Sequence, residues 1–85
     1  MIAIAPQLSW PPVAGELAVY DSRDGRYHVL NLSAAEIWRR IAAGKGAAEI
    51  AAELAETNRA PLDKVRRDVD AFIAGALDMG LLVDG

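Results

Sequence analysis

The chain of 85 residues contains no cysteine and a single histidine, His28. Without thiolates, neither a disulfide framework nor a cysteine-ligated metal site can form, and one imidazole cannot make a cluster of ligands. No Asp-rich loop with the spacing of an EF-hand occurs either. We therefore expect a protein that works without a metal or another cofactor.

Long apolar runs are also missing. No segment approaches the ~20 consecutive apolar residues needed to cross a bilayer, and the first ten residues lack the positive charge of a secretion signal. We expect a cytoplasmic protein with no membrane partner. With 53% hydrophobic and 25% charged residues, the composition predicts one small globular domain over residues 1–85.

A β-hairpin is the clearest local signal that the sequence does contain. Residues 17–21 and 26–30 are β-prone, and the residues between them favour a turn. Asp24 and Gly25 form a pair that tolerates positive φ, as tight hairpins require. The pattern predicts two antiparallel strands over these ranges.

A capped helix is predicted directly after the hairpin. Ser33 is a natural N-cap, and Glu36 stands three residues later as the second half of a capping box. Leu32 and Ile37 occupy the positions of a hydrophobic staple. The helix should run from Ser33 to about residue 43.

Helical patterns fill most of the remaining chain. Residues 47–56 place apolar side chains at helical spacing, and a third helix should begin at Pro61 and run to about residue 79, before Gly80. Residues 2–10 are apolar and strand-prone, but Pro6 interrupts them. They are predicted to form an irregular or edge strand.

This order of elements predicts an α+β fold that is winged helix-turn-helix-like, a three-stranded antiparallel sheet followed by three helices. Such folds often bind DNA, so a winged-helix DNA-binding protein is one alternative. The net charge of −3 gives no attraction for a phosphate backbone. The cations Lys64, Arg66 and Arg67 of the third helix are offset by neighbouring aspartates, so nucleic acid is not the expected partner.

Catalysis finds little support in the sequence. His28 is a titratable group in a predicted strand, but nucleophilic catalysis needs a partner held by the scaffold. The serines are Ser9, Ser22 and Ser33, and the last is assigned to a helix cap. We expect a protein that is not an enzyme.

Short patterns spread over the chain carry a family resemblance. They are DGRYHVLN from residue 24, IW at 37–38, AAEIAAEL from 47, VRRDVDAFI from 65 and GLL from 80. Over about residues 17–83 the chain resembles the PqqD-like family of small peptide-recognition domains, the RiPP recognition elements. The resemblance implies a domain that catalyses nothing, but binds the leader segment of a ribosomally made precursor peptide and presents its core segment to modifying enzymes.

The resemblance also implies where the leader binds. In the family the leader adds as an antiparallel strand to the edge of the third strand, and its apolar side chains enter the groove between that strand and the third helix. Carried over by position, the implied leader-binding residues are Arg26, Tyr27, His28, Val29, Leu30, Val65, Arg66, Asp68, Val69, Phe72 and Ile73.

The sequence leaves open which face of the third strand lines that groove. Alternation puts Tyr27 and Val29 on one face and the other residues of the strand on the opposite one. We expect Leu30 to pack near Trp38 in the core. The apolar positions of the third helix are equally those of an ordinary core.

Three hypotheses for the partner remain. The aromatic third strand and the Ile37-Trp38 pair look most like the stand-alone leader-binding proteins of lasso peptide pathways, which serve a separate leader peptidase and a cyclase. The alternative is a PqqD protein proper, which holds its precursor for a radical SAM enzyme in pyrroloquinoline quinone synthesis. In the third, the strand edge pairs with a second copy of the chain.

Overall fold

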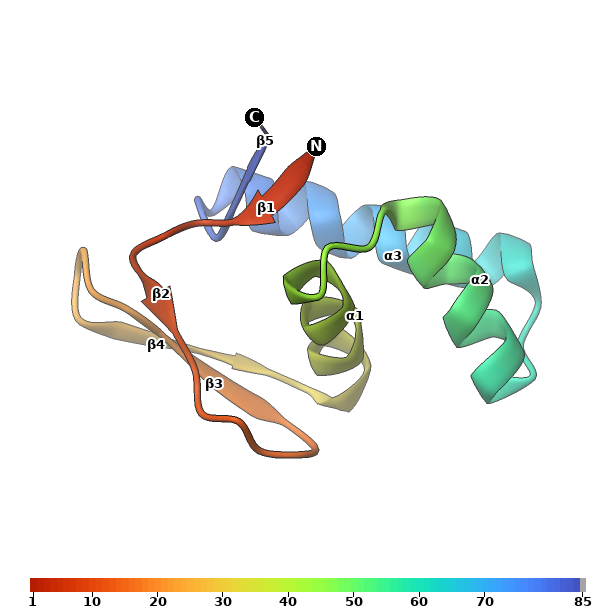
Figure 1. Cartoon of the computed structure of the whole chain (residues 1–85), viewed down its shortest axis with the longest axis horizontal. Coiled ribbons are helices and arrows are strands. Elements are labelled where there is room, and N and C mark those ends of the chain that lie inside the picture. The colour runs from red at the N-terminus through yellow and green to blue at the C-terminus, as the bar shows by residue number, and fades with distance from the viewer. Residues whose placement is uncertain (85) are drawn as a thin grey trace.

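The computed structural model describes residues 1–84. Figure 1 shows the sheet at one side of the molecule, with α1 between the sheet and α2. In chain order the elements are β1 (Ile2–Ile4), β2 (Leu8–Ser9), β3 (Leu17–Asp21), β4 (Arg26–Leu30), α1 (Leu32–Ala42), α2 (Ala47–Asn58), α3 (Leu62–Asp78) and β5 (Leu82–Asp84).

Strands β2, β3 and β4 form one antiparallel sheet in that order. The pairing of β3 with β4 runs from Leu17 opposite Leu30 to Asp21 opposite Arg26. Because side chains alternate between the faces of a sheet, Leu17 and Asp21 are buried whereas Ala18 is exposed. The predicted α+β fold and both strands of the hairpin are confirmed.

The core is centred on Trp38, whose side chain is fully buried. Ile37 and Ile41 are buried on the same side of α1. The ring of Trp38 meets that of Trp10 edge to face, with centroids 5.4 Å apart and an interplanar angle of 82°. Leu30 belongs to the same buried cluster, so the end of β4 is anchored in the core.

The predicted capping of α1 by Ser33 is wrong. The helix begins at Leu32, and its N-cap is Asn31, whose Oδ1 accepts a hydrogen bond of 2.9 Å from the backbone N–H three residues on. Glu36 pairs with Arg40 at 2.9 Å instead of closing a capping box. Leu32 is exposed rather than part of a staple. Asn is as good an N-cap as Ser, which is why the sequence pattern misleads here.

The other helix bounds also move slightly. Helix α2 continues to Asn58 rather than residue 56 and stops at Arg59, which adopts the left-handed conformation with φ of 51°. Pro61 is the N-cap of α3 and not its first helical residue. Gly80, with φ of 75°, turns the chain after α3, as its position after the helical pattern predicts.

A second, two-stranded sheet was not predicted. β1 pairs antiparallel with β5, from Ile2 opposite Asp84 to Ile4 opposite Leu82. Just beyond it, the backbone N–H of Ala5 donates to the carbonyl oxygen of Leu81 at 3.1 Å. This ribbon holds the end of α3 against the segment that leads into β2.

The tip of the hairpin is fixed by an ion pair around a buried carboxylate. Asp21 is only 1% exposed, and it accepts hydrogen bonds from the Arg23 backbone N–H at 2.9 Å and from its guanidinium at 2.8 Å. The Arg23 side chain holds the pKa of Asp21 below its usual value. The guanidinium also lies against Gly80, where a Cβ would come within 3.0 Å of it. The hairpin tip therefore touches the end of α3.

Truncating Trp38 should destabilise the whole domain. Trp38→Ala leaves a large cavity and is expected to lower the free energy of unfolding by about 3–5 kcal/mol, whereas Trp38→Phe keeps a ring at the site and should cost less. Urea denaturation followed by circular dichroism measures both variants. Equal stability of Trp38→Ala and wild type would contradict the central place of this ring.

Asp21 should give the domain an acid-sensitive part of its stability. Because its pKa is lower in the folded chain than in the unfolded one, its contribution is complete above the unfolded pKa of about 4 and is lost as the pH falls through the folded pKa. We expect Asp21→Asn to destabilise at pH 7 and to lose less stability than wild type on acidification to about pH 3. Urea midpoints at the two pH values measure this. Asp63→Asn, at an exposed carboxylate, is the control and should follow wild type.

Candidate functional site

The hydrogen-bonding direction of β3 can be read from its neighbour on the other side. The backbone N–H of Ser22 donates to the carbonyl oxygen of Gln7 across the β2–β3 pairing, at 3.3 Å. In an antiparallel sheet, the backbone N–H and C=O groups of successive residues point alternately to the two neighbouring strands. The backbone groups of even-numbered residues of β3 therefore point toward β2, and those of odd-numbered residues point toward β4.

The outer edge of β4 is therefore open at two residues. Val19 faces β4 and lies opposite His28, so His28 bonds to β3. Tyr27 and Val29 alternate with it and direct their N–H and C=O groups away from the sheet. No strand within residues 1–84 pairs with this edge. The two residues present the donor and acceptor pattern that an added antiparallel strand needs.

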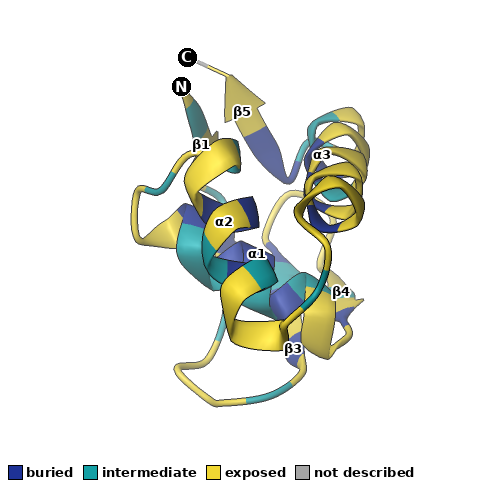
Figure 2. Ribbon diagram, turned by 90° about the vertical axis from the view of Figure 1, so that its right-hand side faces the viewer, coloured by how far each residue is buried: buried dark blue, intermediate teal, exposed yellow. Residues whose placement is uncertain are grey.

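A groove of about 490 Å³ runs between this edge and α3. Figure 2 shows α3 and β4 on the same side of the molecule, with α3 above the strand. The lining is mostly apolar and contains no Asp, Glu, Lys or Arg. Its members are Tyr27, His28, Val29, Leu30, Ala71, Phe72, Gly75, Ala76, Met79 and Leu81.

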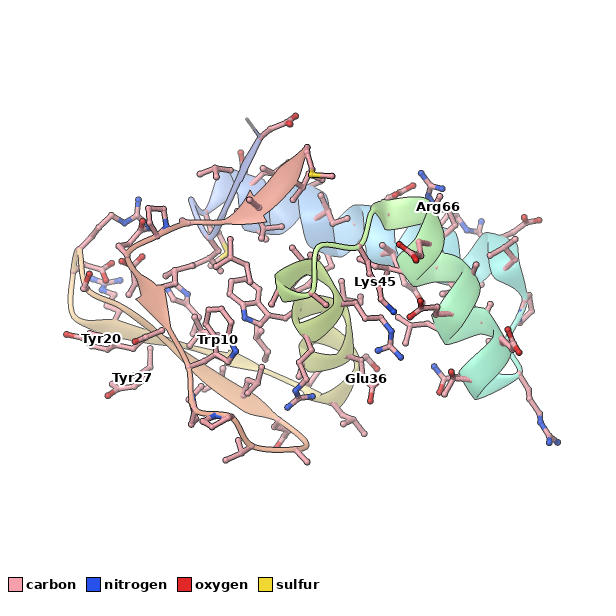
Figure 3. The ribbon with its side chains drawn as sticks, viewed as in Figure 1. Trp10, Tyr20, Tyr27, Glu36, Lys45 and Arg66 are labelled. Atoms are coloured by element: carbon pink, nitrogen blue, oxygen red, sulfur yellow. The ribbon has the colours of Figure 1, made fainter. Side chains whose placement is uncertain are left out.

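The burial of its side chains shows which face of β4 meets the groove. Leu30 is buried and His28 half-buried, which places them on the inner face of the sheet. Tyr27 and Val29 are 66% and 75% exposed, and the ring of Tyr27 packs against that of Tyr20 on the outer face, with centroids 5.1 Å apart (Figure 3). Tyr27 and Val29 therefore contribute to the groove from its rim.

A second groove, of about 270 Å³, lies beyond the end of β4. Leu32 and Ser33 of α1 line one side, and Val65 and Asp68 of α3 the other. Asp68 is paired with Lys64 at 3.0 Å. Because the first groove contains Leu30 and the second Leu32, the two follow one another along α3.

The residues implied by the family resemblance are distributed over these two grooves and the surface. The first groove contains Tyr27, His28, Val29, Leu30 and Phe72, and the second contains Val65, Asp68 and Val69. Ile73 faces the other way and lines a cavity near Met1 and Ile2. Arg66 is paired with Asp70 at 3.1 Å, and Arg26 lies exposed near Asp24. Peptide contact at these residues stays a prediction.

Five residues of the first groove were missed by the sequence analysis, namely Ala71, Gly75, Ala76, Met79 and Leu81. The spacing of three of these residues in the sequence indicates that they lie together. Ala71, Gly75 and Met79 succeed each other at intervals of four along α3, so they share one face of the helix. That face continues past residue 73, the last of the leader-binding residues that the family resemblance implies.

A cluster of ion pairs between α1 and α2 lies outside the first groove. Lys45 and Arg40 bond to the carboxylate of Glu53 at 2.6 and 3.0 Å and lower its pKa. Burial opposes the charge of Arg40, but the carboxylates of Glu36 and Glu53 raise its pKa nevertheless. These contacts join α1 to α2 and the turn between them, so their role is structural.

Within residues 1–84, no three acidic or imidazole side chains gather in a way that would hold a metal ion. Over the same range no helix has the length and apolar character to cross a bilayer. The free strand edge and its groove remain the feature with the clearest capacity to bind.

Known structures share this architecture. "Lasso peptide synthetase B1 complexed with the leader peptide" matches with a TM-score of 0.87 and 24% identity, covering 98% of both chains. "TbiB1 in Complex with the TbiA(beta) Leader Peptide" matches with a TM-score of 0.90 and 20% identity, covering 98% of this chain and 96% of the other. At these identities the likeness establishes a common fold.

Sequence comparison supplies the family. No curated protein matches the chain. The family described as coenzyme PQQ synthesis protein D (PqqD) matches residues 16–82, a range that includes the hairpin, the three helices and the open edge of β4. The chain belongs to the PqqD family.

Proposed function

We propose that this protein is a non-catalytic RiPP recognition element that binds the leader segment of a ribosomally synthesised precursor peptide. The observation that carries the proposal is the open backbone edge of β4 facing an apolar groove on α3. Two proteins of the same fold are described as complexes with leader peptides, which supports a ligand of this class.

Binding would proceed by strand addition. The N–H and C=O groups of Tyr27 and Val29 offer up to four hydrogen bonds, each worth about 0.5–1.5 kcal/mol. They fix the register of the peptide but are indifferent to its sequence. Selectivity then comes from those peptide side chains that point inward, between β4 and α3.

The pathway we propose is lasso peptide biosynthesis. One of the two solved structures above is described as a lasso peptide synthetase, which supports this pathway over a role with a radical SAM enzyme in pyrroloquinoline quinone synthesis. The bound precursor would be handed to a separate leader peptidase and then to a cyclase. The protein itself would hold the leader and perform no bond-breaking step.

An amide NMR titration tests the proposal directly. The ligands are synthetic leader segments from short reading frames encoded beside this one, with an unrelated DNA duplex as the control. We expect shifts over residues 26–30 and along the groove-facing side of α3 up to Leu81. Shifts with DNA but with no leader would overturn the proposal. Light scattering that shows a tight dimer indifferent to leaders would instead support pairing of two strand edges.

Val29→Pro should weaken leader binding without unfolding the domain. The N–H that it removes points outward from β4, so the pairing with β3 is retained, and the proline ring blocks the edge. We expect at least about a tenfold loss of affinity, equivalent to about 1.4 kcal/mol. Val29→Thr keeps the N–H and the β-branch and serves as the matched control. A folded Val29→Pro variant with unchanged affinity by calorimetry would count against strand addition.

A further inference from the structure

Gly75 differs from the other glycines that the structure describes. Gly15, Gly25, Gly44 and Gly80 all have positive φ, a conformation that suits glycine. Gly46 is the N-cap of α2. Gly75 lies inside α3, where glycine is a poorer helix former than every residue except proline.

Nothing in the fold accounts for a glycine at this position. Its backbone is ordinary helix, without a positive φ. A Cβ built on it meets no atom within 4 Å, so no neighbouring element approaches too closely for a side chain. The position is exposed and could carry alanine or a larger residue without disturbing the packing of the domain.

What Gly75 does is shape the middle of the first groove. The contact of Arg23 with Gly80 places the end of α3 at the hairpin tip, and the second groove places the beginning of α3 near Leu32, so α3 runs antiparallel to β4. With a rise of about 1.5 Å per residue in a helix and about 3.3 Å in a strand, Gly75 lies nearly level with His28.

Larger side chains line the groove on both sides of Gly75 along the helix. Phe72 lies one turn before it on α3 and Met79 one turn after it, and both line the groove. Between them, Gly75 has no side chain and leaves a notch on the face of α3, and the small side chain of Ala71 lies one turn before Gly75 on the same face. We infer that this notch receives one bulky apolar or aromatic side chain of the bound peptide, and that Gly75 sets the size of the side chain accepted. The inference rests on the proposed function.

The register of an added strand identifies the peptide residue concerned. A peptide that bonds to Tyr27 and Val29 places the residue between them opposite His28, in a pair without hydrogen bonds. Cross-strand partners project from the same face, so this residue points inward with His28, toward α3. Its side chain enters the notch, while the residues on either side of it point outward.

A first test needs no peptide. Because the fold does not require glycine here, Gly75→Ala should raise the melting temperature by about 4–8 °C. A lowered melting temperature would show that the glycine has a structural role and would overturn the inference.

The second test compares two groove shapes with one library. Random seven-residue peptides displayed on phage are selected on wild type, on Gly75→Leu and on Ala74→Leu, which alters an exposed α3 position outside the groove. We expect wild type and Ala74→Leu to enrich a large apolar or aromatic residue at one position, and Gly75→Leu to enrich Gly, Ala or Ser there. Thermal melts confirm that each variant is folded.

The outcomes distinguish the role of Gly75 from strand addition at the edge of β4. Identical enrichment on wild type and on folded Gly75→Leu, lost on Val29→Pro, would overturn the role of Gly75 and leave strand addition standing. Enrichment that Val29→Pro does not weaken, or no enrichment on wild type at all, would overturn strand addition at this edge and the inference with it.

Discussion

The groove depends on the few hydrogen bonds that tie the turn after α3 to the N-terminal segment. Ala5 donates to the carbonyl oxygen of Leu81 at 3.1 Å, and the Gln7 side chain donates to that of Gly80 at 3.4 Å. Leu81 and Leu82, which follow the turn, are buried. These contacts hold the end of α3 near the hairpin tip but not on top of β4. If α3 packed directly on the strand edge, the outward groups of Tyr27 and Val29 would have no access to a ligand.

An open strand edge beside exposed apolar side chains is also a hazard, because it is a template for aggregation. The structure limits the hazard in two ways. The strand is short, from Arg26 to Leu30, and only two of its residues direct backbone groups outward. In addition, α3 forms the other wall of the groove beside this strand, which narrows the approach to the edge. The same helix that lines the site thus restricts what can reach it.

Local signals explain what the sequence predicted. The hairpin follows from turn residues between two β-prone runs, and its strands were placed at their observed bounds. The cap of α1 was misplaced because Asn31 and Ser33 are equally competent caps two residues apart. The β1–β5 ribbon joins segments from opposite ends of the chain, a pairing that no local pattern reveals. The family patterns implied Ile73 as a groove residue and did not include Gly75, whereas Gly75 lines the first groove and Ile73 lines a different cavity. Such patterns give positions along α3, but which face of the helix meets the groove depends on how the helix packs against the rest of the fold.

The absence of charged side chains from the lining of the first groove has a kinetic consequence. Electrostatic steering accelerates encounter only where charges of opposite sign face each other. A ligand entering this groove would associate at the ordinary rate of about 10⁵–10⁷ M⁻¹s⁻¹, much the same for a right and a wrong sequence. Discrimination between peptides would then lie in their dissociation rates. A site of this kind would select by residence time, which the fit of one or two peptide side chains against α3 would determine.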